Sequence, residues 1–216
     1  IDGGPESGIY KTTDGGAHWT RERRGLPGVS LGRIGLSIKA ADPRIIYATV
    51  EAAERQGGVF RSTDGGASWE KRNPIQPGAM YYAQITADAK DPNRVYELDT
   101  TISVSDDGGA TFRALGEPNK HVDNHVIWID PADPDHYLVG CDGGLYESWD
   151  RAATWAWKTN LPLGQYVDVA VDYAEPFYNI YGGTQDNNDE GGPSRTYSGN
   201  GLTSADALTV GQKLTL

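Results

Sequence analysis

The sequence predicts an all-β protein made of repeated four-stranded antiparallel sheets, and three recurring features support this prediction. The first is a short acidic turn that returns four times, with its central Asp at offsets of 50, 43 and 43 residues. The second is an Asp-Pro turn in the repeats, and the third is a set of short apolar runs beside both turns. A fixed period of this length is typical of repeat architectures.

The acidic turn has the composition of a tight hairpin. Its copies are Thr12–Trp19, Ser62–Trp69, Ser105–Phe112 and the more divergent Ser148–Trp155. The Asp carboxylate can accept bonds from backbone N–H groups further along, and the glycines supply the positive φ that the bend needs. Alternating runs precede the copies at Gly8–Lys11, Gly58–Arg61, Thr101–Val104 and Gly144–Glu147. This period-two alternation predicts half-buried strands joined by the turn, with the final aromatic packed inward.

The Asp-Pro turn marks the boundary between two strands, because Pro cannot sit in a central strand. Its copies are Asp42–Tyr47, Asp91–Tyr96, Asp133–Leu138 and a weaker Glu175–Ile180. One more apolar run lies upstream of each, at Ile34–Ile38, Tyr82–Thr86, Val126–Ile129 and Val167–Val171. Each full repeat therefore contains four antiparallel strands in about 40–45 residues, which predicts one blade of a β-propeller.

The repeats at the two ends of the chain are incomplete. The predicted strands there are Ile9–Lys11 and Trp19–Arg21 in the first repeat, and Val167–Val171, Tyr178–Tyr181 and a piece near Arg195–Ser198 in the fifth. We therefore expect three full blades and two half-blades in one domain, residues 1–206, followed by a tail at 207–216. An open arc leaves unpaired edges. The half-blades could pair within one chain, or two chains could close a larger ring, and we favour this homodimer because blade shape limits how tightly a ring can curl.

The repeated turn, Ser-x-Asp-x-Gly-x-Thr-Trp, is the Asp-box, and the chain resembles the bacterial Asp-box (BNR-type) propellers related to the sortilin luminal domain. Further segments that resemble this family are Leu31–Leu36, Gly183–Asn187 and Gly192–Thr196. The resemblance covers roughly residues 1–206. It implies a secreted or periplasmic protein and a portion of a larger propeller. Members are often labelled glycosyl-hydrolase-like, but that label concerns a structural turn and does not by itself imply activity.

Composition narrows the classes of partner. The formal net charge is −11, which disfavours nucleic acids and anionic membranes because phosphate binding needs clustered Lys and Arg. The single cysteine, Cys141, excludes an intrachain disulfide. No apolar run approaches the ~18 residues of a membrane-spanning helix.

Internal symmetry separates structural residues from candidate functional ones. A residue that recurs in every blade is expected to be structural, whereas an unrepeated residue on the loops is a better candidate for function. Asp88, Asp130 and Asp172 stand 42 residues apart, each just after the first strand of a repeat. They are interpreted as turn caps, as are the four Asp residues of the acidic turns.

The unrepeated segment His121-Val122-Asp123-Asn124-His125 leads into the first strand of the fourth blade. Because alternate residues of a strand face the same side, we expect His121, Asp123 and His125 to point together at the mouth of the channel. Such a set could bind a divalent metal, zinc or manganese. The alternative is that these groups only satisfy backbone groups or one another.

Two more unrepeated loops belong to the same face by topology. One holds Asp142, which together with Asp123 and His125 forms the candidate catalytic set, with His125 as the base. The other holds the candidate ligand-binding residues Gln185, Asp186 and Asn187, to which Tyr81 and Arg33 are added. Two functions stay open: a module that binds a glycan or peptide on its loop face, and a hydrolase acting on glycosidic, ester or phosphoester bonds. A fragment with little activity of its own is a third reading.

Overall fold

The computed structural model describes residues 3–78, 82–161, 164–186, 188–199 and 201, and the backbone of 208–209. The chain forms two compact units, Ile1–Thr159 and Asn160–Leu216, and each is described by itself. The described residues form antiparallel strands and one short 3₁₀ turn, Ala53–Arg55, which confirms the all-β fold. No helix in this part of the chain has the length and apolarity needed to cross a bilayer.

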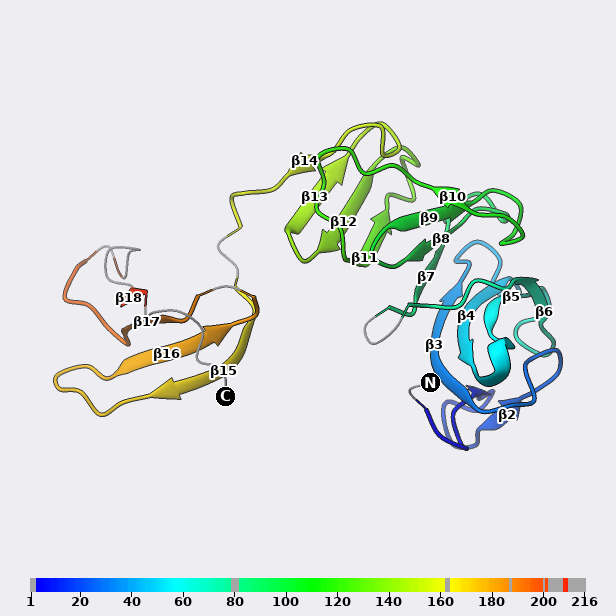
Figure 1. The fold of residues 1–216 in the computed structure, drawn as a ribbon, viewed down its shortest axis with the longest axis horizontal. Helices are drawn as coiled ribbons and strands as arrows, with labels where there is room; N and C mark the ends of the chain where they lie inside the picture. The colour runs from blue at the N-terminus through cyan, green and yellow to red at the C-terminus, as the bar shows by residue number, and fades with distance from the viewer. Residues whose placement is uncertain are drawn as a thin grey trace. The chain divides into compact units, whose positions relative to one another are not determined.

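The first unit contains four successive sheets, in which strands adjacent in sequence pair with one another (Figure 1). The first sheet has two strands, β1 (Ile9–Lys11) and β2 (Thr20–Glu22). The strands of the second sheet are β3 (Leu31–Ile38), β4 (Ile46–Ala52), β5 (Gly58–Ser62) and β6 (Glu70–Asn73). Those of the third are β7 (Gln84–Ala87), β8 (Val95–Leu98), β9 (Ile102–Ser105) and β10 (Arg113–Ala114). Those of the fourth are β11 (Asn124–Ile129), β12 (Tyr137–Cys141), β13 (Gly144–Ser148) and β14 (Ala156–Trp157).

The acidic turns have the structural role that the sequence predicts. In the second copy, the Asp64 carboxylate accepts hydrogen bonds from the Ser62 hydroxyl and the Ser68 backbone N–H, both at 2.8 Å. Gly65 and Gly66 have φ of 71° and 89°, in the left-handed region that glycine adopts without strain. The fourth copy keeps the Asp bonds but has Arg151 and Ala152 at the glycine positions, also with positive φ.

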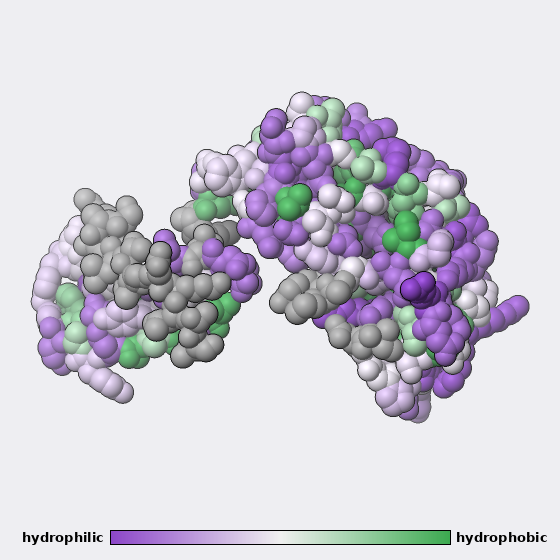
Figure 2. Space-filling model, viewed as in Figure 1, coloured by the Kyte–Doolittle hydropathy of each residue, from purple (hydrophilic) through white to green (hydrophobic). Residues whose placement is uncertain are grey.

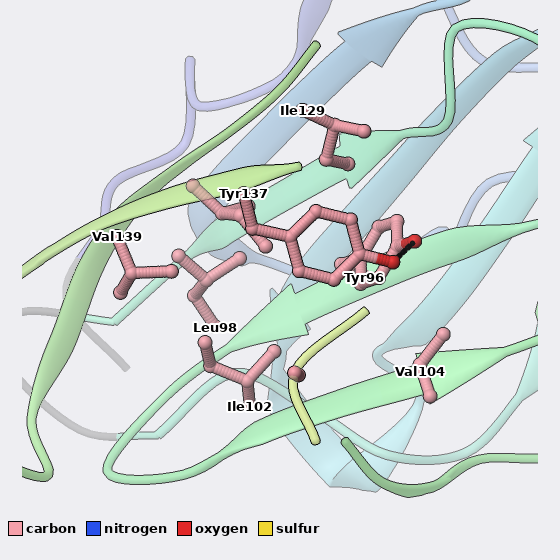
Figure 3. Packing of buried hydrophobic residues seen from close by; sticks show 9 residues of the cluster. Tyr96, Leu98, Ile102, Val104, Ile129, Tyr137 and Val139 are labelled. Atoms are coloured by element: carbon pink, nitrogen blue, oxygen red, sulfur yellow. Dashed lines mark hydrogen bonds between the residues drawn. The ribbon is translucent and has the colours of Figure 1, made fainter. Parts of the chain in front are cut away.

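Apolar side chains fill the space between successive sheets of the first unit. One cluster joins the third and fourth sheets, with Tyr96 and Tyr137 at its centre (Figure 3). The hydroxyl groups of these two residues are hydrogen-bonded at 2.8 Å. Leu98 and Val139 lie in the same cluster and are fully buried. Two further clusters join the first to the second sheet and the second to the third. Sheet-on-sheet burial of this kind stabilises a propeller.

The fifth sheet, in the second unit, differs from the expected half-blade because it has four strands. They are β15 (Tyr166–Val171), β16 (Asn179–Thr184), β17 (Glu190–Pro193) and β18 (Leu208–Thr209). The third strand lies upstream of the expected Arg195–Ser198, and β18 falls within the segment predicted as a tail. The glycine pair in β17 lacks the side-chain alternation by which strands are identified, and its pairing depends on backbone bonds. A single domain over residues 1–206 stays a prediction.

Candidate functional site

Four side chains meet at one edge of the third and fourth sheets, and we call them the His125 cluster: Tyr82, Asp123, His125 and Asp142. His125 is the second residue of β11, and Asp142 lies in the tight turn between β12 and β13. His125 Nε2 lies 2.8 Å from Asp142 Oδ1, and both side chains are about half exposed. Of the two carboxylates in the candidate catalytic set, Asp142 is therefore the one that contacts the imidazole of His125.

Tyr82 completes the cluster from the neighbouring sheet. It precedes β7, and its hydroxyl donates a 2.8 Å hydrogen bond to Asp123 Oδ1. Its ring also stacks on the imidazole of His125, with centroids 5.7 Å apart and planes 13° apart. The hydrogen bond to the Asp123 carboxylate raises the pKa of Tyr82 above its ordinary value. Asp123 and His125 thus come together through a tyrosine from the adjacent repeat.

The backbone at Asp123 is held in a shape that few residues adopt. Asp123 has φ of 63°, in the left-handed region where Asp is one of the tolerated residues. Its N–H donates to the carbonyl of Thr100 at 2.8 Å, and its own carbonyl accepts from the N–H of Asp142 at 3.2 Å. The turn between β8 and β9 and the turn between β12 and β13 therefore fix Asp123 from two sides.

A buried polar network supports the loop that carries Asp123. The ammonium group of Lys120, which is fully buried, contacts Glu117 Oε1 at 2.6 Å and also the side-chain oxygen of Asn124. Asn124 is itself fully buried and donates to the carbonyl of Thr100 at 3.1 Å. Lys120 also lies 5.6 Å from the ring of Trp155. This network, which sequence reasoning missed, fixes the loop because each buried charge has a partner.

The expected alternation of His121, Asp123 and His125 is wrong. The strand begins only at Asn124, and its register shifts between Asn124 and Val126, so period-two alternation does not extend back to His121. His121 instead directs Nδ1 to the carbonyl of Val122 at 2.9 Å. Within the described residues, no group of three or more His, Cys, Asp or Glu is arranged to hold a metal ion. The zinc or manganese site stays a prediction.

The other predicted ligand-binding residues lie elsewhere or outside the described residues. Arg33 lies in β3 of the second sheet, where its backbone N–H donates to Glu51 at 3.1 Å. Gln185 and Asp186 follow β16 in the second unit, where the Gln185 amide donates to Asp186 at 3.0 Å. The predicted residues Tyr81 and Asn187 fall outside the described residues. Tyr82, next to the predicted Tyr81, is the tyrosine that contacts the cluster.

The periodic carboxylates are turn caps, as the sequence predicts. Asp88 accepts hydrogen bonds from the N–H groups of Lys90 and Asp91 at 2.8 and 2.9 Å. Asp130 accepts from Ala132 at 2.7 Å, and Asp172 accepts from Asn179 at 2.7 Å. These local bonds hold the pKa of Asp130 and Asp172 below the ordinary value. The carboxylates that recur at a fixed period therefore have the structural role that their periodicity predicts.

The arrangement of the His125 cluster suits two kinds of chemistry. When the ionised Asp142 accepts the Nε2–H of His125, it fixes the tautomer and leaves Nδ1 as the nitrogen that could take a proton. Asp123 and Asp142 offer oxygen acceptors beside two stacked rings, which are groups that bind hydroxyl and N–H donors. The first property suits general-base catalysis and the second suits ligand recognition.

Comparisons with known proteins identify the repeat. A family model described as BNR/Asp-box repeat matches residues 60–71, which include the second acidic turn. No curated protein matches the chain.

Several solved structures are similar to this chain. The GH74 enzyme of Niastella koreensis is 10% identical with a TM-score of 0.50, covering 74% of this chain and 28% of that one. An ancestral GH74 enzyme is 14% identical with a TM-score of 0.53, covering 90% and 28%. YCF48 bound to D1 peptide is 16% identical with a TM-score of 0.49, covering 85% and 57%. The chain spans 28% of the length of the two GH74 enzymes. At such identities the likeness to those two shows the propeller fold alone.

Proposed function

We propose that the chain is an Asp-box propeller module that binds a glycan or a peptide at the His125 cluster. The observation that supports this most is the convergence of Tyr82, His125 and Asp142 from three separate segments at one edge of two adjacent sheets. None of the matching positions in the other repeats, Ile34, Ala83 and Val167, holds a histidine. Unrepeated groups on a repeated scaffold are the ones that the fold itself does not require.

The chemistry of the cluster indicates the class of ligand. Its two carboxylates can accept hydrogen bonds from sugar hydroxyls or from peptide N–H groups, and its stacked rings offer an apolar surface. The net charge of −11 disfavours an anionic ligand, so we expect a neutral or cationic one. The resemblance to the sortilin luminal domain agrees with a binding role, and it stays a resemblance.

Binding to panels of neutral oligosaccharides and of peptides, with and without basic residues, tests this proposal. His125→Ala and Asp142→Asn should each weaken the best ligand by about 10-fold or more, since each removes a polar contact. His18→Ala is the matched control, because His18 is an exposed histidine that pairs with Asp14 in the first acidic turn. If the cluster variants bind every ligand as tightly as the control does, the proposed site is wrong.

A hydrolase is the second candidate, and the His125–Asp142 contact of 2.8 Å is the observation that favours it. In that reading His125 is the general base and Asp142 orients it, with Asp123 held by Tyr82. Turnover of chromogenic glycosides, esters and phosphoesters should then disappear in His125→Ala. The metal prediction is tested in the same samples: zinc or manganese bound in equimolar amount should be lost in His125→Ala and in His121→Ala.

We also infer that the chain pairs with a second copy, and we expect secretion or a periplasmic location from the resemblance. The first sheet supports this pairing of chains, because it has only two strands. So small a sheet leaves strand edges that a second chain can cover. Solution mass by light scattering tests pairing, with twice the chain mass of 23.3 kDa expected.

A further inference from the structure

The aromatic residue that ends each acidic turn shows which sheet faces are covered. Trp19 and Trp69 hold the same local geometry, because their indole N–H groups donate to Gly16 and Gly66 carbonyls at 3.1 and 3.0 Å. Their environments differ, since Trp19 is 60% exposed and Trp69 only 6%. The difference therefore comes from what lies over the ring and not from the turn.

Within the first unit, the later aromatics are covered by the sheet of the preceding repeat. Trp69 packs in a cluster with Ile9 of the first sheet. Phe112 packs against a cluster that includes Tyr47 and Val59 of the second sheet. Trp155 packs in the same way against the cluster between the third and fourth sheets. In three repeats, therefore, the aromatic residue that ends the acidic turn packs against the apolar face of the preceding sheet.

Trp19 and Tyr10 are both exposed, and Tyr10 pairs in register with Arg21, two positions after Trp19, which places both aromatic residues on one face of the first sheet. In β1 the neighbouring residue, Ile9, points the other way and is buried against the second sheet. Because side chains alternate along a strand, Tyr10 lies on the opposite face, where no described sheet of the first unit covers it. An exposed tryptophan beside an exposed tyrosine is typical of an interaction surface.

The fifth sheet offers a face of the complementary kind. Val169 of β15 and Ile180 of β16 are exposed, and Figure 2 shows hydrophobic residues over this sheet. A hollow of about 350 Å³ lies on it, lined by Tyr166, Val169, Ile180, Gly182, Glu190, Gly191, Gly192 and Pro193. The ring of Tyr166 lies over Gly182, whereas the exposed side chains of Val169 and Ile180 leave an apolar surface on which an aromatic ring of a partner can pack.

The charges of the two surfaces are also complementary. Residues 6–24, around the first sheet, contain four basic and three acidic residues. Residues 164–199, which form most of the fifth sheet, contain six acidic residues and one basic residue. The first segment therefore has a net charge of +1 and the second a net charge of −5, so docking the first surface on the second is favoured over pairing two fifth-sheet faces, which would repel each other.

We propose that Trp19 and Tyr10 of one chain dock on the apolar face of the fifth sheet, around Val169 and Ile180, of a second copy. This inference rests on the pairing of two chains proposed above, and it specifies which surfaces of the two chains are in contact. The contact is face to face, like the contacts between the sheets of the first unit, and requires no exchange of half-blades. Two such contacts, related by a two-fold axis, join the chains reciprocally.

Sedimentation of the wild type and two variants tests the interface. Trp19→Ser should weaken the dimer by about 30-fold or more, as expected for a central tryptophan of an interface. Val169→Asp should weaken it similarly from the other side, by placing a charge on the apolar face. The control is Trp157→Ser, which removes an equally exposed tryptophan (59%) from β14 and should leave the dimer unchanged.

Mixing the two variants distinguishes this interface from one in which each face pairs with the same face of the second chain. Trp19→Ser keeps an intact fifth sheet and Val169→Asp keeps an intact first sheet, so the mixture can form one of the two contacts. An equimolar mixture should therefore dimerise more tightly than either variant alone. Dimers that survive in Trp19→Ser, or variants that show no recovery on mixing, would overturn the interface while leaving pairing intact. A wild-type monomer at every concentration would overturn both, whereas ligand binding at the His125 cluster is measured separately.

Discussion

Glu97 is a buried acid between the second and third sheets, and its replacement by Gln is the sharpest test of how these sheets pack. It lies in β8, where only 6% of its surface is exposed, and it accepts a 3.0 Å hydrogen bond from the Thr49 hydroxyl of β4. Burial disfavours the charged form and raises its pKa from 4.5 to about 7. The carboxyl group is therefore protonated in the folded chain over a pH range in which it is ionised in the unfolded chain.

The size and sign of the effect follow from linkage. Below pH 4.5 Glu97 is protonated in both states, and its contribution to stability is fully present. As pH rises from 4.5 to about 7, the unfolded chain releases the proton while the folded chain retains it, so stability falls. Each pKa unit is worth about 1.4 kcal/mol. The free energy of unfolding should therefore lose about 3 kcal/mol across this range because of Glu97.

Urea denaturation of wild type and Glu97→Gln at a series of pH values measures this contribution. The amide can still accept the Thr49 hydrogen bond but does not titrate. The difference in unfolding free energy between variant and wild type should shift in favour of the variant by about 3 kcal/mol between pH 4.5 and 8. Glu54→Gln, at an exposed position of the 3₁₀ turn, should give curves parallel to the wild type. Parallel curves for Glu97→Gln would show that the carboxyl group is hydrated and that our account of this interface is wrong.

Three other predictions follow from single interactions. Lys120→Met, which leaves the Glu117 carboxylate buried without its ammonium partner, should destabilise the chain by about 3–5 kcal/mol in denaturant melts, and adding Glu117→Gln should recover part of the loss. Tyr137→Phe removes the hydrogen-bond partner of the Tyr96 hydroxyl and should lower the free energy of unfolding by about 1–2 kcal/mol. The double variant, with Phe at both positions, should lose less than twice that amount, and fully additive losses would contradict the hydrogen bond. The hydrogen bonds from Ser68 hold the pKa of Asp64 at about 2. Asp64→Asn should therefore lower the thermal midpoint above pH 4, and the difference from the wild type should vanish as the pH falls through 2. A difference that does not depend on pH would argue against this turn cap.

The sequence by itself predicted most of the scaffold, because the acidic and Asp-Pro turns are local structures. The bonds of Asp64 run to residues within four positions, so the residues that make the turn are adjacent in the printed sequence. The same locality explains why Asp88 and Asp130 could be assigned as turn caps. It also explains the failure at β17, where a Gly-Gly pair carries no side-chain pattern and the strand is defined only by its pairing with β16.

The candidate site was predicted only in part, because its geometry depends on contacts between segments far apart in the chain. Sequence reasoning found His125 and Asp142 as unrepeated residues, but extended the strand back to His121. The left-handed backbone at Asp123, which is fixed by the carbonyl of Thr100, breaks that alternation.

Tertiary structure alone decided which groups meet. Tyr82 reaches Asp123 across 41 positions of sequence, and Thr49 reaches Glu97 across 48. The exposure of Trp19 against the burial of Trp69 is likewise invisible in two nearly identical turns. Local hydrogen bonding is determined by neighbours in the chain, whereas burial and side-chain partners depend on which sheet packs against which.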